Sequence, residues 1–188
     1  MNSDDENNIA EWRAERLRQR VADFQARRPI LLRDAGQLND EVAEWGSRLF
    51  DNTARMLVIT GDTGTAKTWN VWEVLERAIK VGYAGEIMFL TSAEWQDIIG
   101  PPRDLERLRK MRTVNVLVVD DLGSFRINDW QRDLLGPVID ERWNNGLPTA
   151  ITSNMDDFDA ALGERLTSRL GDGAIVAMLE GADLRAGR

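Results

Sequence analysis

The chain has 188 residues, which suits one domain with a small extension, and it carries a formal net charge of −8. Its content of 43% hydrophobic and 30% charged residues is enough to bury a core and is not that of a disordered chain. There is no cysteine and no histidine, which excludes disulfides, cysteine-rich zinc sites and mechanisms with a thiol nucleophile or an imidazole base. The negative charge argues against a large stand-alone DNA-binding surface.

Residues 3–28 are predicted to form one amphipathic helix that ends at Arg28-Pro29, because a residue before proline is pushed out of helical geometry. A connector over 30–36 and a second helix over 39–50 follow. The apolar stripe of the first helix consists of Ile9, Trp12, Leu17, Val21 and Phe24. This stripe must pack either on its own domain or on a partner. We therefore separate residues 1–36, an N-terminal helix and linker that is a candidate partner-docking segment, from the main domain over 37–188.

The rest of the chain alternates short apolar strands with helices, a pattern that predicts a parallel sheet covered on both faces. Strands are expected at 56–60, 87–90, 114–119, 149–152 and 174–178. Helices are expected at 67–81, 92–99, 103–112, 128–143 and 157–170.

The first strand runs into GDTGTAKT at 61–68 and then into a helix, the context that a phosphate-binding P-loop requires. Backbone N–H groups of the loop and of the helix N-terminus would bind the phosphates, and Lys67 would add a charge at the β- and γ-phosphates. The Thr68 hydroxyl would ligate Mg²⁺. The predicted ATP-binding residues are Gly61, Asp62, Thr63, Gly64, Thr65, Ala66, Lys67, Thr68 and Trp69.

One position departs from the P-loop pattern, which has glycine before the lysine where this chain has Ala66. Alanine adds one methyl group, and we expect a near-helical backbone that tolerates it. If the backbone does not tolerate this methyl group, ATP binding would be weaker or turnover slower.

A second motif, VLVVDDLG at 116–123, is an apolar strand that ends in two carboxylates. Asp120 is predicted to hold Mg²⁺, and Asp121 to polarise the attacking water. Lys67 and Asp120 lie 53 residues apart, and the 87–90 strand falls between them, which leaves room for a strand inserted between the P-loop strand and the acidic strand. That spacing suits the ATPase branch of P-loop folds better than small nucleotide kinases.

Over residues 30–188 the chain resembles AAA+ ATPases of the DnaC/IstB type, which are bacterial and phage helicase loaders and transposition helpers. The resemblance rests on the P-loop, VLVVDDLG, PTAITSNMDD at 148–157, and ERLTSRLGDG at 164–173 followed by EGADLR at 180–185. It implies an α/β P-loop NTPase fold of the AAA+, ASCE type, with the core over 37–188. The N-terminal extension is shorter than that of larger family members, and we expect no helical lid domain after Arg188.

The resemblance also implies roles for residues near the end of the chain. Asn154 matches sensor 1, which orients water and reads the γ-phosphate; an Asx turn after a strand is the other interpretation. Arg169 matches the arginine finger that acts on a neighbouring subunit, with Arg165 as the second candidate. A cation that stabilises the C-terminus of its own helix is the other interpretation of Arg169. Arg185 matches sensor 2. An arginine finger in trans requires a homo-oligomer.

A basic cluster formed by Arg103, Arg107, Arg109, Lys110 and Arg112 lies where related loaders place a helix that faces DNA. It is either a phosphate-tracking patch or a solvated helix face.

We therefore expect an ATPase that requires ATP and Mg²⁺ and loads a replicative helicase at single-stranded DNA. The alternatives are a transposition helper that recruits a transposase on duplex DNA, a non-hydrolysing nucleotide-binding adaptor, and a small-molecule kinase, which the residues favour least. The apolar runs are too short to cross a bilayer, and the acidic start MNSDDENN lacks the features of a signal peptide, so we expect a cytoplasmic protein with no membrane partner.

Overall fold

Five parallel strands form one sheet in the computed structural model, which describes residues 3–33, 36–123, 127–154 and 158–181. The strands are β1 (Met56–Gly61), β2 (Ile87–Thr91), β3 (Val116–Asp120), β4 (Thr149–Thr152) and β5 (Ile175–Leu179). The predicted strands are confirmed, and the largest change is that β3 begins at Val116 rather than Val114.

The order of the strands across the sheet is β2-β3-β4-β1-β5. The strand between the P-loop strand and the acidic strand is therefore β4, and β2 lies on the outer side of β3. Leu57 of β1 pairs with Ala150 of β4, and Ala150 pairs in turn with Val118 of β3. This register brings the carboxyl ends of β1, β3 and β4 to one edge of the sheet.

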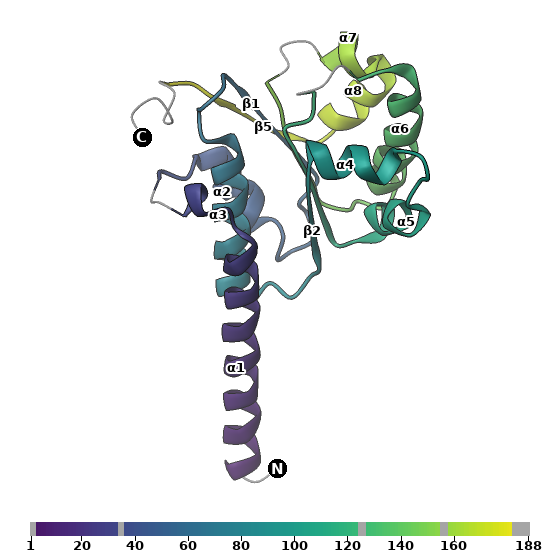
Figure 1. Cartoon of the computed structure of the whole chain (residues 1–188). Coiled ribbons are helices and arrows are strands. Elements are labelled where there is room, and N and C mark those ends of the chain that lie inside the picture. The colour runs from purple at the N-terminus through teal and green to yellow at the C-terminus, as the bar shows by residue number, and fades with distance from the viewer. Residues whose placement is uncertain (1–2, 34–35, 124–126, 155–157, 182–188) are drawn as a thin grey trace.

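Helices cover both faces of the sheet, as predicted. The helices are α1 (Ser3–Arg27), α2 (Asp40–Ser47), α3 (Lys67–Lys80), α4 (Ser92–Ile99), α5 (Leu105–Thr113), α6 (Asp129–Asn144), α7 (Phe158–Leu162) and α8 (Glu164–Gly171), with a 3-10 turn at Ile30–Leu32. Figure 1 shows α2 and α3 on one side of the sheet and α4 to α8 on the other.

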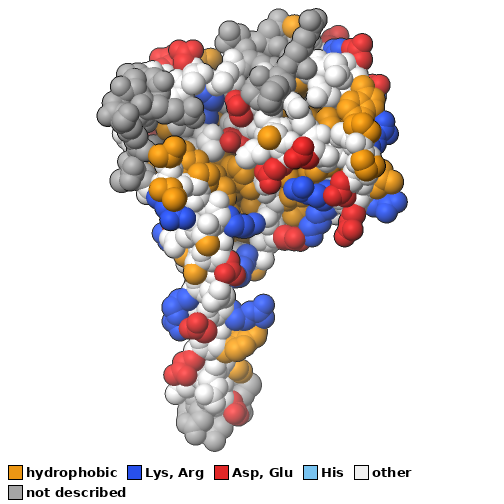
Figure 2. All heavy atoms as spheres, in the orientation of Figure 1, with side chains coloured by type: hydrophobic (Ala, Val, Ile, Leu, Met, Phe, Trp, Pro, Cys, Tyr) orange, Lys and Arg blue, Asp and Glu red, His pale blue; other side chains and the backbone are white. Residues whose placement is uncertain are grey.

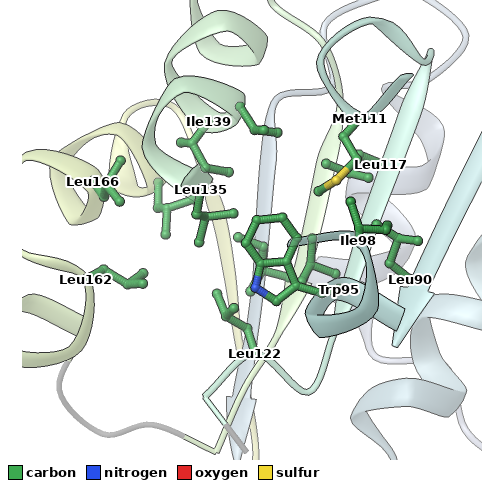
Figure 3. Packing of buried hydrophobic residues seen from close by; sticks show 14 of the residues in the cluster. Leu90, Trp95, Ile98, Met111, Leu117, Leu122, Leu135, Ile139, Leu162 and Leu166 are labelled. Atoms are coloured by element: carbon green, nitrogen blue, oxygen red, sulfur yellow. The ribbon is translucent and has the colours of Figure 1, made fainter. Parts of the chain in front are cut away.

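Alternate residues of each central strand enter two separate cores. Leu57 and Ile59 pack under α2 and α3, whereas Met56 and Val58 face the opposite side. On that opposite side Trp95 of α4 lies among leucine and isoleucine side chains of β2, α6 and α8 (Figure 3). Burial on both faces explains why the strands are apolar throughout rather than alternating.

Helix α1 is confirmed, but its predicted apolar stripe is divided. Leu17, Val21 and Phe24 pack against the core beside α3, with the Phe24 ring 4.8 Å from that of Trp72. Ile9 and Trp12 remain 41% and 58% exposed. Figures 1 and 2 show the reason, since the N-terminal half of α1 extends away from the sheet and carries charges of both signs beside a hydrophobic patch. No helix in the described ranges is long and apolar enough to cross a membrane.

The helix expected at 157–170 is two helices, α7 and α8, which Gly163 separates. Gly163 has φ +84°, a left-handed conformation that ends α7, since only glycine adopts it without strain. Arg165 and Arg169 both lie on α8.

Candidate nucleotide-binding site

The loop over 61–68 leaves β1 and enters the first turn of α3, as predicted. Gly61 has φ +134°, and a Cβ added there would lie 2.0 Å from the Leu179 carbonyl oxygen, so only glycine fits beside β5. The Lys67 ammonium donates to the carbonyls of Gly61 and Asp62, at 2.7 and 2.6 Å, and is 8% exposed. The charge of Lys67 is therefore held inside the curve of the loop, where a P-loop lysine meets phosphate oxygens.

The backbone of Ala66 is left-handed rather than near-helical, so our expectation for this residue was wrong. Ala66 has φ +67° and ψ +23° and is the N-cap of α3. This conformation turns the chain from the loop into the helix, and it places the Cβ of an L-residue too close to the next carbonyl, which costs about 1–2 kcal/mol. The glycine of the usual pattern avoids this strain, and alanine does not.

We expect Ala66→Gly to raise the free energy of unfolding by roughly 0.5–1 kcal/mol, because relief of the left-handed strain exceeds the larger entropy that glycine gives the unfolded chain. Urea denaturation in the absence of nucleotide measures this change in the free energy of unfolding. Ala22→Gly, at an exposed position of α1, is the control and should destabilise by roughly 0.5–1 kcal/mol. Destabilisation by both substitutions would contradict the strain at Ala66.

Asp120 lies at the end of β3, where its carboxylate meets one hydroxyl from α3 and one from β4. Its carboxylate accepts from the Thr68 hydroxyl at 2.9 and 3.1 Å, and from the Thr152 hydroxyl at 2.6 Å. Burial raises the pKa of Asp120, and the hydrogen bonds from Thr152 and Thr68 oppose that rise. The carboxylate is thus oriented toward the P-loop helix while its charge is poorly solvated.

We expect Asp120→Asn to be more stable than the native chain at pH 7 in the absence of nucleotide and metal. The folded-state pKa of Asp120 lies above its unfolded value near 3.8, so stability is lost as pH rises through the folded pKa and the carboxyl ionises. Asparagine does not ionise, so the difference between the two proteins should shrink as pH falls toward 4. Thermal melts from pH 4 to pH 8 measure this trend, and a difference that is constant with pH would refute it.

Asp121 and Asn154, the predicted water-polarising and sensor residues, lie side by side. The Asn154 amide donates to Asp121 Oδ1 at 3.4 Å. Asp121 has φ +58°, so the chain turns sharply after Asp120. The carboxylates of Asp120 and Asp121 therefore point in different directions. Aspartate is one of the residues that adopt this conformation at modest cost.

Sequence reasoning missed Thr152, which is 1% exposed and connects the two acids. Its hydroxyl donates to Asp120 and accepts the backbone N–H of Asp121, at 2.8 Å. The signal was present, because a hydroxyl residue ends an apolar strand two residues before Asn154. In the described ranges no group of three acidic side chains is placed to hold a metal by itself. Thr68 and Asp120 supply oxygen ligands that suit Mg²⁺ bound together with phosphate and water.

The predicted arginine finger, Arg169, lies against its own subunit. Its guanidinium lies 3.8 Å from the centre of the Trp143 ring, and its Nε is 3.5 Å from Asp140 Oδ1. Arg165 pairs with the other oxygen of Asp140 at 2.5 Å but is 77% exposed. Both arginines thus line one side of α8 next to α6. Arg185, the predicted sensor 2 residue, lies outside the described residues.

The basic cluster is spread over α5 and the loop before it. Lys110 pairs with Glu86, and Arg112 lies 3.7 Å from Glu141. Arg103 stacks on the Trp130 ring at 5.1 Å. Arg109 is exposed and Arg107 is half-buried on α5.

The family model described as "IstB-like ATP binding protein" matches residues 7–176. The chain is 24% identical over 132 residues to the replicative helicase loader DnaC of Escherichia coli strain K12, covering 64% of this chain and 52% of DnaC. It is 27% identical over 101 residues to the replicative helicase loader DnaI of Bacillus subtilis, covering 52% of this chain and 32% of DnaI.

A crystal structure of the DnaC helicase loader superposes with a TM-score of 0.62 at 25% identity, covering 79% of this chain and 96% of that one. The predicted AAA+ fold is thereby confirmed. The chain spans about half or less of the length of these two curated loaders.

Proposed function

The chain belongs to the family of IstB-like ATP-binding proteins, and on that premise we propose that it hydrolyses ATP with Mg²⁺ and loads a replicative helicase at single-stranded DNA. The observation that carries the ATPase proposal is the convergence of Thr68, Asp120 and Thr152 beside the P-loop, with Asp121 and Asn154 next to them. The printed names of the DnaC and DnaI relatives support the helicase as partner.

Each group has a distinct role in this proposal. Lys67 and the loop N–H groups bind the phosphates, and Thr68 and Asp120 hold Mg²⁺, which offsets charge on the phosphate oxygens. Asp121 accepts a hydrogen bond from the attacking water, and Asn154 orients that water against the γ-phosphate. Thr152 fixes the angle between the two acids through its bonds to both.

We further propose that Arg169 acts on the ATP of a neighbouring copy, so that the site is completed by assembly. Its exposed fraction of 35% and its support by Trp143 are compatible with a guanidinium presented at a surface. A planar cation there would stabilise the charge that develops on the transferred phosphoryl group, an effect worth about 10³–10⁵ in rate.

Mixing two inactive variants tests the action in trans. Lys67→Met should bind ATP about a hundredfold more weakly, and Arg169→Ala should bind ATP without hydrolysing it. If Arg169 acts in trans, a mixture recovers part of the native rate, because interfaces form in which one copy supplies Arg169 and the other an intact P-loop. No recovery at any ratio, with both variants folded, would assign Arg169 to its own subunit. Arg165→Ala tests the second candidate for the arginine finger, since it removes the neighbouring contact to Asp140 and leaves Arg169 in place.

The DNA form separates the proposed loader from its alternatives. Hydrolysis by the native chain should rise with single-stranded DNA and fall again when Arg107 and Arg109 are both replaced by alanine. A rise with duplex DNA alone would favour a transposition helper, a second candidate that the IstB-like family match supports. Tight ATP binding without turnover on either DNA would favour the non-hydrolysing adaptor.

A further inference from the structure

Asn70 is a buried polar residue on the P-loop helix that the proposed mechanism does not use. It is the fourth residue of α3 and is 2% exposed. Its side-chain amide donates to the Ala66 carbonyl at 3.1 Å, and its side-chain oxygen accepts the backbone N–H of Asn39 at 2.8 Å. Asn39 is in turn the N-cap of α2, where its side chain accepts from Val42 N–H at 3.1 Å.

A carboxamide at this position is unexpected from packing alone. Its helix neighbours Val71, Val74 and Leu75 are buried in the apolar core, and burying an amide is unfavourable unless its partners are polar. Asparagine is also a poor residue for a helix interior, because its side chain competes for backbone groups. Here that competition is directed at one carbonyl, the carbonyl of the strained residue Ala66.

The hydrogen bond from Asn70 to the Ala66 carbonyl sets the orientation of the peptide group between Ala66 and Lys67. The Ala66 carbonyl accepts two N–H groups of Asn70, one from the backbone at 3.0 Å and one from the side chain at 3.1 Å. Because a trans peptide is planar, fixing the direction of this carbonyl fixes the opposite direction of the Lys67 N–H. That N–H belongs to the loop that we propose binds phosphate.

We propose that Asn70 is a positioning residue that holds Ala66 in the left-handed conformation and thereby keeps the P-loop ready for phosphate. It compensates for the alanine that stands in place of the usual glycine, and its second bond anchors this arrangement to the start of α2. The inference rests on the proposed ATP site, since the N–H groups being positioned are the phosphate-binding ones.

A double-mutant cycle between positions 66 and 70 tests the coupling. We expect Asn70→Ala to weaken binding of a fluorescent ATP analogue with Mg²⁺ by about five- to tenfold. In the Ala66→Gly background the same substitution should cost about twofold or less, because glycine adopts the left-handed conformation unaided. Equal losses in both backgrounds would overturn the proposal and leave Asn70 as a tie between α2 and α3.

Two further variants separate positioning from general damage. Asn70→Ser can still donate to the carbonyl four residues earlier, so it should bind the analogue within about twofold of the native chain. A loss equal to that of Asn70→Ala would overturn the proposal. Asn145→Ala is the matched control, because the Asn145 amide makes the same bond to the Glu141 carbonyl, at 2.7 Å, at the far end of α6. It should leave binding unchanged.

The same proteins distinguish failure of this inference from failure of the proposed function. If the native chain binds no nucleotide, the proposed ATP site is wrong, and the free energies of unfolding then decide the inference alone. Coupled effects of Asn70→Ala and Ala66→Gly on unfolding would support the positioning role, and additive effects would refute it.

Discussion

Lys67→Met is expected to weaken MgATP binding by about a hundredfold, because charge-assisted hydrogen bonds to phosphate are worth roughly 2–3 kcal/mol. Methionine keeps the apolar stem of the side chain and removes only the ammonium, which lies within hydrogen-bond distance of the Gly61 and Asp62 carbonyls. Isothermal titration with ATP and Mg²⁺ measures the loss. The effect should exceed that of any single hydroxyl in the site, since Lys67 is the one residue of the loop over 61–68 with a positive charge.

The control for Lys67 lies on the same helix. Lys80 is near the C-terminal end of α3, is 51% exposed and pairs with Glu76 at 2.6 Å. Lys80→Met changes the net charge equally and removes the ion pair with Glu76, a buried carboxylate that keeps its hydrogen bonds from Arg28 and Gln25. Equal weakening by both substitutions would mean that net charge, rather than the position of Lys67, governs the binding of ATP.

The sequence was sufficient to predict the sheet, because continuous apolar strands separated by helices have few other arrangements. It was also sufficient to predict that Thr68 and Asp120 meet, since the P-loop strand and the acidic strand both end at the same edge of a parallel sheet. The order of the strands across the sheet could not be predicted in the same way. The position of β4 between β1 and β3 depends on which crossovers the whole chain makes, and spacing along the chain does not encode it.

The residues that sequence reasoning missed are defined by their partners. Thr152 is one strand-ending threonine among several until the register places its hydroxyl between the carboxylate of Asp120 and the N–H of Asp121. The backbone of Ala66 follows from the turn into α3 and not from the properties of alanine. The stripe on α1 was divided for a similar reason: helical periodicity identifies an apolar face, but the length of contact with α3 decides how much of it is buried.

Arg142 is the clearest example of a residue whose importance the sequence conceals, and its replacement is expected to have the largest effect on stability. It is fully buried on α6, and its five N–H groups donate to five oxygens. These are the carbonyls of Met111, Val114, Asn115 and Pro148 and the hydroxyl of Thr149. The guanidinium thus joins the C-terminal end of α5 to the starts of β3 and β4.

Arg142→Leu should lower the free energy of unfolding by about 3–5 kcal/mol, because several buried carbonyls lose their donor at once. Arg142→Lys should recover only a minor part of this loss, since an ammonium cannot span the acceptors that the planar guanidinium reaches. Arg77→Leu, which breaks an exposed pair with Glu73 on α3, is the control and should change stability by about 0.5 kcal/mol or less.

Urea denaturation at several pH values distinguishes the role of hydrogen bonding from that of charge at Arg142. Burial lowers the pKa of Arg142 to about 10, below its ordinary value, so the side chain stays protonated in the folded and unfolded chains at neutral pH. The loss from Arg142→Leu should therefore be constant between about pH 6 and pH 9, because a group titrating only above this window adds no proton uptake within it. A loss that varies across that window would show that the substitution changes the titration of other groups. A loss no larger than that of Arg77→Leu would mean that the carbonyls find water or other donors, and that the junction of α5, β3 and β4 does not depend on this side chain.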